Sequence, residues 1–172
     1  KRGLIMGLAN DKSLAWGIAQ KLREEGAELA FSYQGEALEK RVRPLAAEVG
    51  SDFLIPCDVS DMGLLDATFD AVAAKWGRLD FVVHAISFSD KNELRGGYVD
   101  TTLENFLLTM NISAYSFVAV AKRARALMPA GGSLLTLSYY GAEKVIPHYN
   151  VMGVAKAALE TSVKYLAMDL GP

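Results

Sequence analysis

The chain has 172 residues, of which 51% are hydrophobic and 22% are charged, and its formal net charge at pH 7 is −2. This composition is that of one ordinary globular domain and excludes a disordered chain. Because the balance is slightly acidic and no long basic tract offsets it, a nucleic acid is not expected as a partner.

Cys57 is the single cysteine, which excludes an internal disulfide bond and a cysteine metal cluster, and we expect no metal. It follows an apolar run and is expected to be a small buried side chain. No stretch approaches the ~20 apolar residues that span a bilayer, and we expect no N-terminal signal. We therefore expect a cytoplasmic protein without a membrane partner.

Apolar runs and helical patterns alternate along the chain. Strands are predicted at 3–7, 28–33, 52–59, 79–86 and 132–140, and helices at 13–26, 36–50, 61–77, 102–110, 112–128 and 149–171. Strands that are apolar throughout are typical of a parallel sheet covered by helices. The sequence therefore predicts an α/β fold, a Rossmann-like doubly wound parallel sheet flanked by helices, in a single dinucleotide-binding domain over residues 1–172.

The turn after the first strand can form a phosphate site. Gly7 lets the chain leave the strand sharply, and free N–H groups near Ser13 and Leu14, where Ser13 is the expected N-cap, can bind a pyrophosphate. Gly17 is expected to let the helix pack closely on the sheet. The glycines do not form a G-x-G-x-x-G motif, so this segment alone leaves a plain strand-to-helix loop equally open.

The ends of the next strands favour one cofactor. Gln34 can hydrogen-bond to a ribose and Glu36 would repel a 2′-phosphate, which favours NADH over NADPH. Asp58 and Val59 follow the third strand at the same edge, where adenine is expected. Pro44 is expected to kink or break the second helix. His84, in the fourth strand, is expected to be packed and hydrogen-bonded.

The segment LTLSYYGAEKVIPHYNVMGVAK, from Leu135 to Lys156, concentrates candidate catalytic residues. Tyr149 and Lys156 are seven residues apart, so a helix starting at 149 would place them on one face. Tyr139 lies at the carboxyl end of the predicted fifth strand, and the loop GAEKVIPH can bring Tyr139 back towards Tyr149. Amphipathic aromatic residues without a catalytic role are the alternative, but the joint placement with Lys156 favours a site.

Six segments together resemble a known family. They are GLANDKSLAWGIA, SYQGE, CDVS, VHAISFS, NISAYSF and LSYYGAEKVIPHYNVMGVAKAALE. In this order they resemble the short-chain dehydrogenase/reductase superfamily and, within it, the bacterial type I enoyl-[acyl-carrier-protein] reductases. Superfamily members usually have Tyr-x3-Lys, whereas Tyr-x6-Lys with a second tyrosine upstream is typical of this branch. The resemblance implies NADH-dependent reduction of trans-2-enoyl thioesters, carried by acyl carrier protein, in fatty acid elongation.

The resemblance also implies roles for individual residues. Tyr149 would stabilise the thioester oxygen where charge develops, Tyr139 would line the substrate pocket, and Lys156 would bind the nicotinamide ribose. The role of Asn111 stays open between a proton relay and helix packing, and Ser87 and Ser89 depart from the family pattern. Cofactor contacts fall on Gly7, Ser13, Leu14, Gln34, Asp58, Val59, Ile86 and Lys156, and substrate contacts on Ser89, Tyr139 and Tyr149.

Larger features follow from the same resemblance. The helices predicted at 112–128 and 149–171 would build a homotetramer, and the chain would lack a C-terminal part beyond MDLGP. Two other functions remain open: another short-chain oxidoreductase acting on a ketone or alcohol, and a non-catalytic dinucleotide-binding sensor. The Tyr-x6-Lys spacing and Tyr139 argue against the first, and the presence of Tyr149 with Lys156 argues against the second.

Overall fold

The structure is a computed structural model that describes residues 1–171. The chain divides into two compact units, and each is described by itself. The sheet unit comprises Lys1–Ala85 and Lys122–Thr136, and the helical unit comprises Ile86–Ala121 and Leu137–Pro172.

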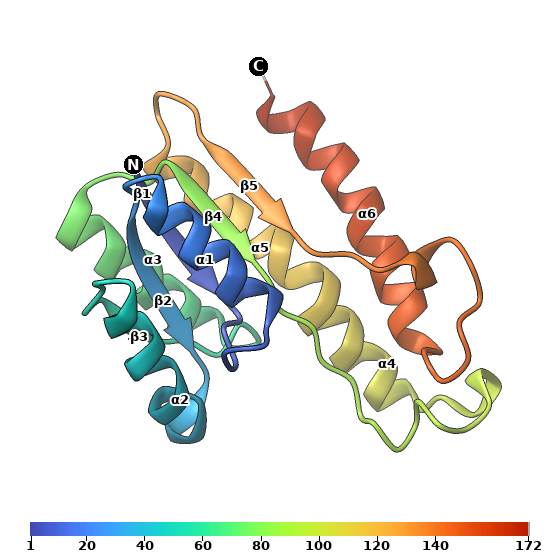
Figure 1. Ribbon diagram of the computed structural model, residues 1–172. Helices are drawn as coiled ribbons and strands as arrows, with labels where there is room; N and C mark the ends of the chain where they lie inside the picture. The colour runs from blue at the N-terminus through green and yellow to red at the C-terminus, as the bar shows by residue number, and fades with distance from the viewer. Residues whose placement is uncertain (172) are drawn as a thin grey trace. The chain divides into compact units, whose positions relative to one another are not determined.

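The sheet unit is built on five parallel strands (Figure 1). These are β1 (Arg2–Met6), β2 (Glu28–Tyr33), β3 (Leu54–Pro56), β4 (Phe81–His84) and β5 (Ser133–Thr136). Their order is β3-β2-β1-β4-β5, and every pairing in it is parallel. The chain therefore winds outward from β1 in both directions, which confirms the predicted Rossmann-like doubly wound sheet and places the switch point between β1 and β4.

Three helices of the sheet unit connect its first four strands. They are α1 (Leu14–Glu24), α2 (Gly35–Glu48) and α3 (Met62–Trp76). Because parallel crossovers are right-handed, α1 and α2 lie on one face of the sheet, and α3, which returns across β1, lies on the other. The helices flank the sheet as the apolar strands predicted.

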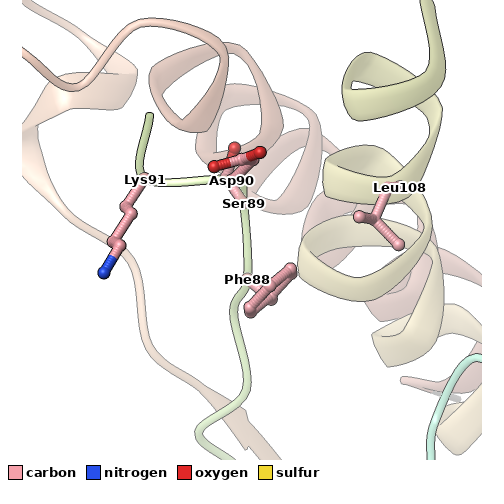
Figure 2. Close-up of a pocket in the computed structure, with 5 residues that line it drawn as sticks. All are labelled: Phe88, Ser89, Asp90, Lys91 and Leu108. Carbon is pink, nitrogen blue, oxygen red and sulfur yellow. The ribbon is translucent and has the colours of Figure 1, made fainter. Parts of the chain in front are cut away.

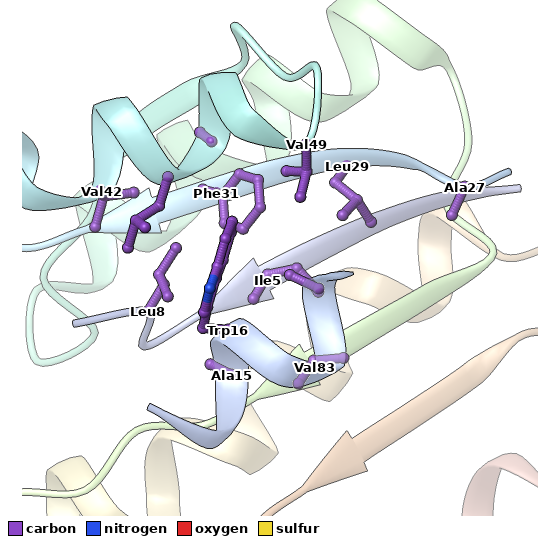
Figure 3. Packing of buried hydrophobic residues seen from close by; sticks show 13 residues of the cluster. Ile5, Leu8, Ala15, Trp16, Ala27, Leu29, Phe31, Val42, Val49 and Val83 are labelled. Carbon is purple, nitrogen blue, oxygen red and sulfur yellow. The ribbon is translucent and has the colours of Figure 1, made fainter. Parts of the chain in front are cut away.

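One hydrophobic cluster joins α1 and α2 to the sheet (Figure 3). Phe31 at its centre is fully buried, and Trp16 of α1 packs into the same cluster. The cluster comprises Ile5, Leu8, Ala15, Trp16, Ala19, Ala27, Leu29, Phe31, Val42, Leu45, Ala46, Val49 and Val83. This packing fixes the end of β1 and the start of α1, which frame the predicted phosphate turn.

The helical unit contains α4 (Leu103–Met110), most of α5 (Ser116–Ala124) and α6 (Val151–Leu170). A π-helical segment, Asn111–Tyr115, joins α4 directly to α5. The two separate helices predicted at 102–110 and 112–128 are therefore one continuous helical run with a π turn inside it. Such turns insert an extra residue into a helix and leave no loop for a sequence pattern to reveal.

Two local expectations need correction. Of the kink or break expected at Pro44, the break is wrong, because α2 continues to Glu48. The carbonyl that loses its partner belongs to Lys40, four residues earlier, and Lys40 is exposed, so water can bond to this oxygen. Gly17 does not serve close packing either, because a Cβ built there would meet nothing within 4 Å.

Gly17→Ala is therefore expected to stabilise the sheet unit by about 0.5–1 kcal/mol, the usual gain of alanine over glycine inside a helix. Urea unfolding followed by circular dichroism measures this change as a higher midpoint with an unchanged slope. A lower midpoint would show that Gly17 has a packing role after all.

Candidate active site

The turn between β1 and α1 has the backbone that a phosphate site needs. Gly7 has φ 94°, a left-handed conformation that glycine adopts without strain. Ser13 occupies the N-cap position of α1, but its hydroxyl donates to the carbonyl of Asn10 (2.7 Å) and caps no helix N–H. Leu14, the first helical residue, is 72% exposed. No side-chain cap therefore occupies the first amide groups of α1, as a phosphate site at this turn requires.

Gln34 and Asp58 meet at the carboxyl edge of the sheet. The Gln34 Nε2 donates to Asp58 Oδ2 (2.7 Å), which ties the ends of β2 and β3 together. Burial acts against the Asp58 carboxylate, but hydrogen bonds from the side chain and backbone of Ser60 and from Gln34 leave its pKa lowered. Asp58 is therefore a fixed acceptor beside Val59, which is buried.

The charge of Glu36 is partly compensated. Lys40 Nζ lies 2.7 Å from Glu36 Oε1, one turn further along α2, and both side chains are exposed. Glu36 therefore repels a 2′-phosphate less than its charge alone suggests. The predicted preference for NADH over NADPH therefore rests more on Gln34. Its amide group is paired with the Asp58 carboxylate, whose negative charge would repel a 2′-phosphate.

Tyr139 and Tyr149 lie together in the helical unit. Their ring centroids are 5.0 Å apart and the planes are nearly perpendicular, at 73°. Burial, and next the neighbouring Tyr139, raise the pKa of Tyr149. The Tyr149 phenol therefore stays protonated at neutral pH and is available as a hydrogen-bond donor.

Tyr149 does not belong to a helix. Because α6 begins at Val151, the expectation that helix periodicity aligns Tyr149 with Lys156 is wrong. His148 and Asn150, on either side of Tyr149, have positive φ values of 61° and 41°. Such backbone costs on the order of 1–3 kcal/mol per residue and persists where surrounding contacts enforce it.

Two glycines make room for the Tyr149 ring. A Cβ on Gly141 would lie 2.3 Å from a ring carbon of Tyr149, and one on Gly153 would lie 2.7 Å from the carbonyl oxygen of Gly141. The loop after β5 therefore packs directly on the first turn of α6, with the tyrosine ring against bare backbone.

Gly141→Ala is expected to displace the Tyr149 ring and to lower turnover about tenfold to a hundredfold, since displacements near 1 Å can cost this much. Steady-state turnover of an enoyl thioester, the substrate class that the sequence resemblance implies, measures the effect, with Gly17→Ala as the matched control. Unchanged turnover in Gly141→Ala would show that the position of this ring does not matter.

Lys156 of α6 is buried, with 6% of its surface exposed. Its Nζ donates to the carbonyl of Leu137 (2.7 Å), and one turn further along α6 Glu160 accepts a hydrogen bond from Ser138. Two consecutive residues of the segment leading to Tyr139 are thus tied to α6. Burial lowers the pKa of the Lys156 ammonium.

Lys156→Met is expected to change how stability depends on pH. A lowered folded-state pKa means that the unfolded chain binds the proton more tightly, so the native chain gains stability as pH rises through the folded value towards 10.5. Lys156→Met lacks this gain. Urea unfolding of both proteins at neutral pH and near pH 10 measures this. The free energy of unfolding of the wild-type protein, relative to that of the variant, should be higher near pH 10. The same difference at both pH values would contradict a cost of burying the charged lysine.

Ser89 lies in a polar network and beside a hollow. Thr109 Oγ1 donates to Ser89 Oγ (2.9 Å), and the Asn105 amide donates to the same oxygen (3.1 Å). A pocket of about 480 Å³ is lined by Phe88, Ser89, Asp90, Lys91 and Leu108 (Figure 2). Tyr139 and Tyr149 do not line this pocket.

Within residues 1–171, the remaining residues singled out in the sequence make no contact that indicates a catalytic role. Asn111 is the first residue of the π-helical segment, and Ile86, the first residue of the helical unit, is half-buried. His84 is fully buried, with Nδ1 3.1 Å from Thr136 Oγ1, and is packed as expected. Cys57 is buried as predicted, and burial raises the pKa of its thiol.

Residues 1–171 contain neither a cluster of metal ligands nor a membrane-spanning helix. Their His, Cys, Asp and Glu side chains form no group of three or more that could hold a metal ion. Within the same residues, every helix is too short or too polar to cross a membrane.

The predicted site residues divide between the units. Gly7, Ser13, Leu14, Gln34, Asp58 and Val59 belong to the sheet unit, whereas Ile86, Ser89, Tyr139, Tyr149 and Lys156 belong to the helical unit. Sequence reasoning missed the supporting residues Gly141, Asn150 and Glu160. Glu160 carries a sequence signal, since it follows Lys156 by four residues; the other two depend on contacts between distant segments.

Comparison with known proteins places the chain in a family. The family model described as enoyl-(acyl carrier protein) reductase matches residues 7–172. "Enoyl-[acyl-carrier-protein] reductase [NADH] 2" of Rhizobium meliloti is 67% identical over 99% of this chain, which spans 64% of that relative's length.

Solved structures agree. A crystal structure of enoyl-(acyl-carrier-protein) reductase from Anaplasma phagocytophilum in complex with NAD is 63% identical, with a TM-score of 0.97 over 99% of this chain and 65% of that one. The Bacillus cereus enoyl-acyl carrier protein reductase with NADP+ and indole naphthyridinone is 48% identical, with a TM-score of 0.97 over 99% of this chain and 67% of that one. With a family model over nearly the whole sequence and these relatives, the chain belongs to the enoyl-(acyl carrier protein) reductase family.

Proposed function

We propose that this chain catalyses the NADH-dependent reduction of trans-2-enoyl thioesters bound to acyl carrier protein. The main support is the Tyr139–Tyr149 ring contact, beside the segment at Leu137 that the buried Lys156 holds by a hydrogen bond. Neither a ketone reductase nor a non-catalytic sensor requires this second tyrosine. The named activity of the Rhizobium meliloti relative supports the same reaction.

Tyr149 is the proposed hydrogen-bond donor to the thioester oxygen. Reduction at the β-carbon makes that oxygen negative as an enolate forms, and a neutral phenol nearby stabilises this charge. The raised pKa of Tyr149 supports the role, because the phenol keeps its proton until charge develops. Tyr139 packs edge-on against the Tyr149 ring and limits its orientations, and in the proposal it also contacts the substrate.

The residues of the chain fit a dinucleotide. When bound, NADH supplies the hydride. In the proposal the turn at Gly7, Ser13 and Leu14 binds the pyrophosphate, since the side chain of Ser13 does not cap the helix amides. Adenosine contacts are assigned to Gln34, Asp58, Val59 and Ile86, and Lys156 donates to the nicotinamide ribose. Its positive charge also favours the anionic enolate.

The wider assignments are proposals of the same kind. Ser89 is assigned to the substrate because it lines the 480 Å³ pocket with the apolar Phe88 and Leu108. A single domain over residues 1–172 is supported by one family model that spans both units. A cytoplasmic location is supported by the lone buried Cys57, which needs no oxidising compartment.

A homotetramer is proposed from exposed apolar side chains. Tyr115 beside α5 is 53% exposed, and Tyr165 and Met168 of α6 are 71% and 79% exposed. Apolar side chains on the outer faces of helices mark surfaces that associate. Sedimentation of the natural protein tests this, and a monomer at micromolar concentration would contradict it.

The activity is tested by NADH oxidation with a crotonyl thioester and, separately, a β-keto thioester, using the natural protein that contains this chain. The proposal expects turnover of the crotonyl substrate alone, and slower turnover when NADPH replaces NADH. Turnover of the keto substrate alone would identify another short-chain oxidoreductase. Cofactor binding without turnover of either substrate would identify a sensor.

A further inference from the structure

Asn150 stands at the N-cap of α6 but does not cap it. Asparagine usually accepts a hydrogen bond there from an amide of its own helix. In α6 no side-chain cap bond forms, and the Asn150 amide nitrogen is turned to another segment. It donates towards the carbonyl oxygens of Gly96 (2.8 Å), Glu93 (3.2 Å) and Leu94 (3.4 Å). The two hydrogens of this NH2 group are therefore shared among three carbonyl oxygens of a single loop.

The backbone of Asn150 is strained in the same place. Its φ is 41° and its ψ is −123°, a combination that a residue with a Cβ rarely adopts. Asn150 directly follows Tyr149. The backbone conformation that directs the Asn150 amide to the loop therefore also influences the position of Tyr149. Strain of this kind persists only where other contacts compensate for it, and the three carbonyl contacts are such compensation.

The loop is also held from its other side. The Glu93 carboxylate accepts hydrogen bonds from the Thr102 amide (3.0 Å) and hydroxyl (2.8 Å), at the N-cap of α4. Residues 93–96 therefore join the start of α4 to the residue that follows Tyr149.

The segment before this loop forms a wall of the pocket. The Phe88 amide donates to Ser113 Oγ (3.0 Å), and the Asp90 amide donates to Asn105 Oδ1 (2.9 Å). Phe88, Ser89, Asp90 and Lys91 line the pocket together with Leu108 (Figure 2). The chain from Phe88 to Gly96 is thus fixed at its beginning to the π-helical segment and to α4, and at its end to Asn150.

We infer that Asn150 is a positioning residue that locks the loop 93–96 to Tyr149, so that the pocket wall and the tyrosine keep one fixed arrangement. The amide does this as a donor, which a carboxylate in the same place cannot do. The inference rests on the proposed reductase function for its catalytic consequence, but the lock itself is a property of the loop.

Asn150→Gly separates the two effects, because glycine accepts the backbone conformation while the amide is lost. Amide hydrogen exchange of peptides covering residues 90–97 should then be at least about tenfold faster, since the open state of the loop becomes more populated. Turnover of the crotonyl thioester should fall about tenfold with the Kd for NADH within about twofold, because a displaced tyrosine affects the reacting oxygen and not the cofactor.

Two further variants complete the test. Asn150→Asp, of nearly the same size, should reproduce the fast exchange because its oxygens face carbonyl oxygens. His148→Gly relaxes the other positive φ without touching the amide, and should leave both exchange and turnover as in the wild-type protein.

The inference is supported if both Asn150 variants show fast exchange and slow turnover while His148→Gly shows the exchange and turnover of the wild-type protein. Unchanged exchange in Asn150→Gly overturns the lock, and fast exchange with unchanged turnover overturns the positioning role. If the wild-type protein reduces no enoyl thioester, the proposed function fails, while the exchange comparison still decides whether Asn150 holds the loop.

Discussion

Tyr149→Phe is expected to lower turnover of a crotonyl thioester by about 10²–10³, the usual loss when one donor to a developing oxyanion is removed. Phenylalanine keeps the ring, so the edge-on contact with Tyr139 and the packing on Gly141 remain. The loss therefore falls on the hydroxyl alone. The Kd for NADH, measured by fluorescence titration, should stay within about twofold, because an interaction made only in the transition state does not alter ground-state binding.

Tyr140→Phe is the matched control for this experiment. Tyr140 is adjacent to Tyr139 and 55% exposed, and it has no role in the proposed chemistry. Its variant should retain wild-type turnover. Equal losses in Tyr149→Phe and Tyr140→Phe would show that the assay reports general damage, and full activity in Tyr149→Phe would remove the hydroxyl from the mechanism.

Lys156→Met should impair both cofactor binding and turnover. A hydrogen bond from a charged group is worth about 1.5–3 kcal/mol, so loss of the ammonium is expected to weaken NADH binding about 10–100-fold. The Leu137 carbonyl also loses its partner, which frees the segment leading to Tyr139. Turnover at saturating NADH should therefore fall as well, unlike the pattern expected for Tyr149→Phe.

Lys164→Met supplies the control, because Lys164 lies on the same helix and is exposed. It should bind NADH and turn over substrate as the wild-type protein does. If Lys156→Met binds NADH normally and loses only turnover, then Lys156 supports the loop and not the cofactor.

The fold was predictable because its signals are local. Each strand is an apolar run, and most helices end near a glycine or begin at a capping residue, so the order of elements and the parallel sheet follow from the sequence pattern. The ends were less accurate: β3 is confined to Leu54–Pro56 and β5 to Ser133–Thr136. Pairing with neighbouring strands sets these limits, and a single sequence does not contain that information.

The candidate site was predictable in its residue types and not in its geometry. Tyr139 and Tyr149 were expected together and are in ring contact. The helix argument that linked Tyr149 to Lys156 failed, because the chain turns at Asn150 with positive φ before α6 begins. That turn depends on carbonyls more than fifty residues earlier in the chain, at positions 93–96, and no local pattern encodes them.

Deuterium transfer gives the most direct measurement of the central claim. The natural protein is incubated with a crotonyl thioester and NADH labelled with deuterium at its transferable position, and the product is analysed by mass spectrometry and NMR. The proposed chemistry predicts a saturated acyl thioester with deuterium at the β-carbon and unlabelled hydrogen at the α-carbon. Tyr149→Phe should form this labelled product more slowly, in proportion to its lower turnover. No saturated product, or a saturated product without deuterium at the β-carbon, would contradict it.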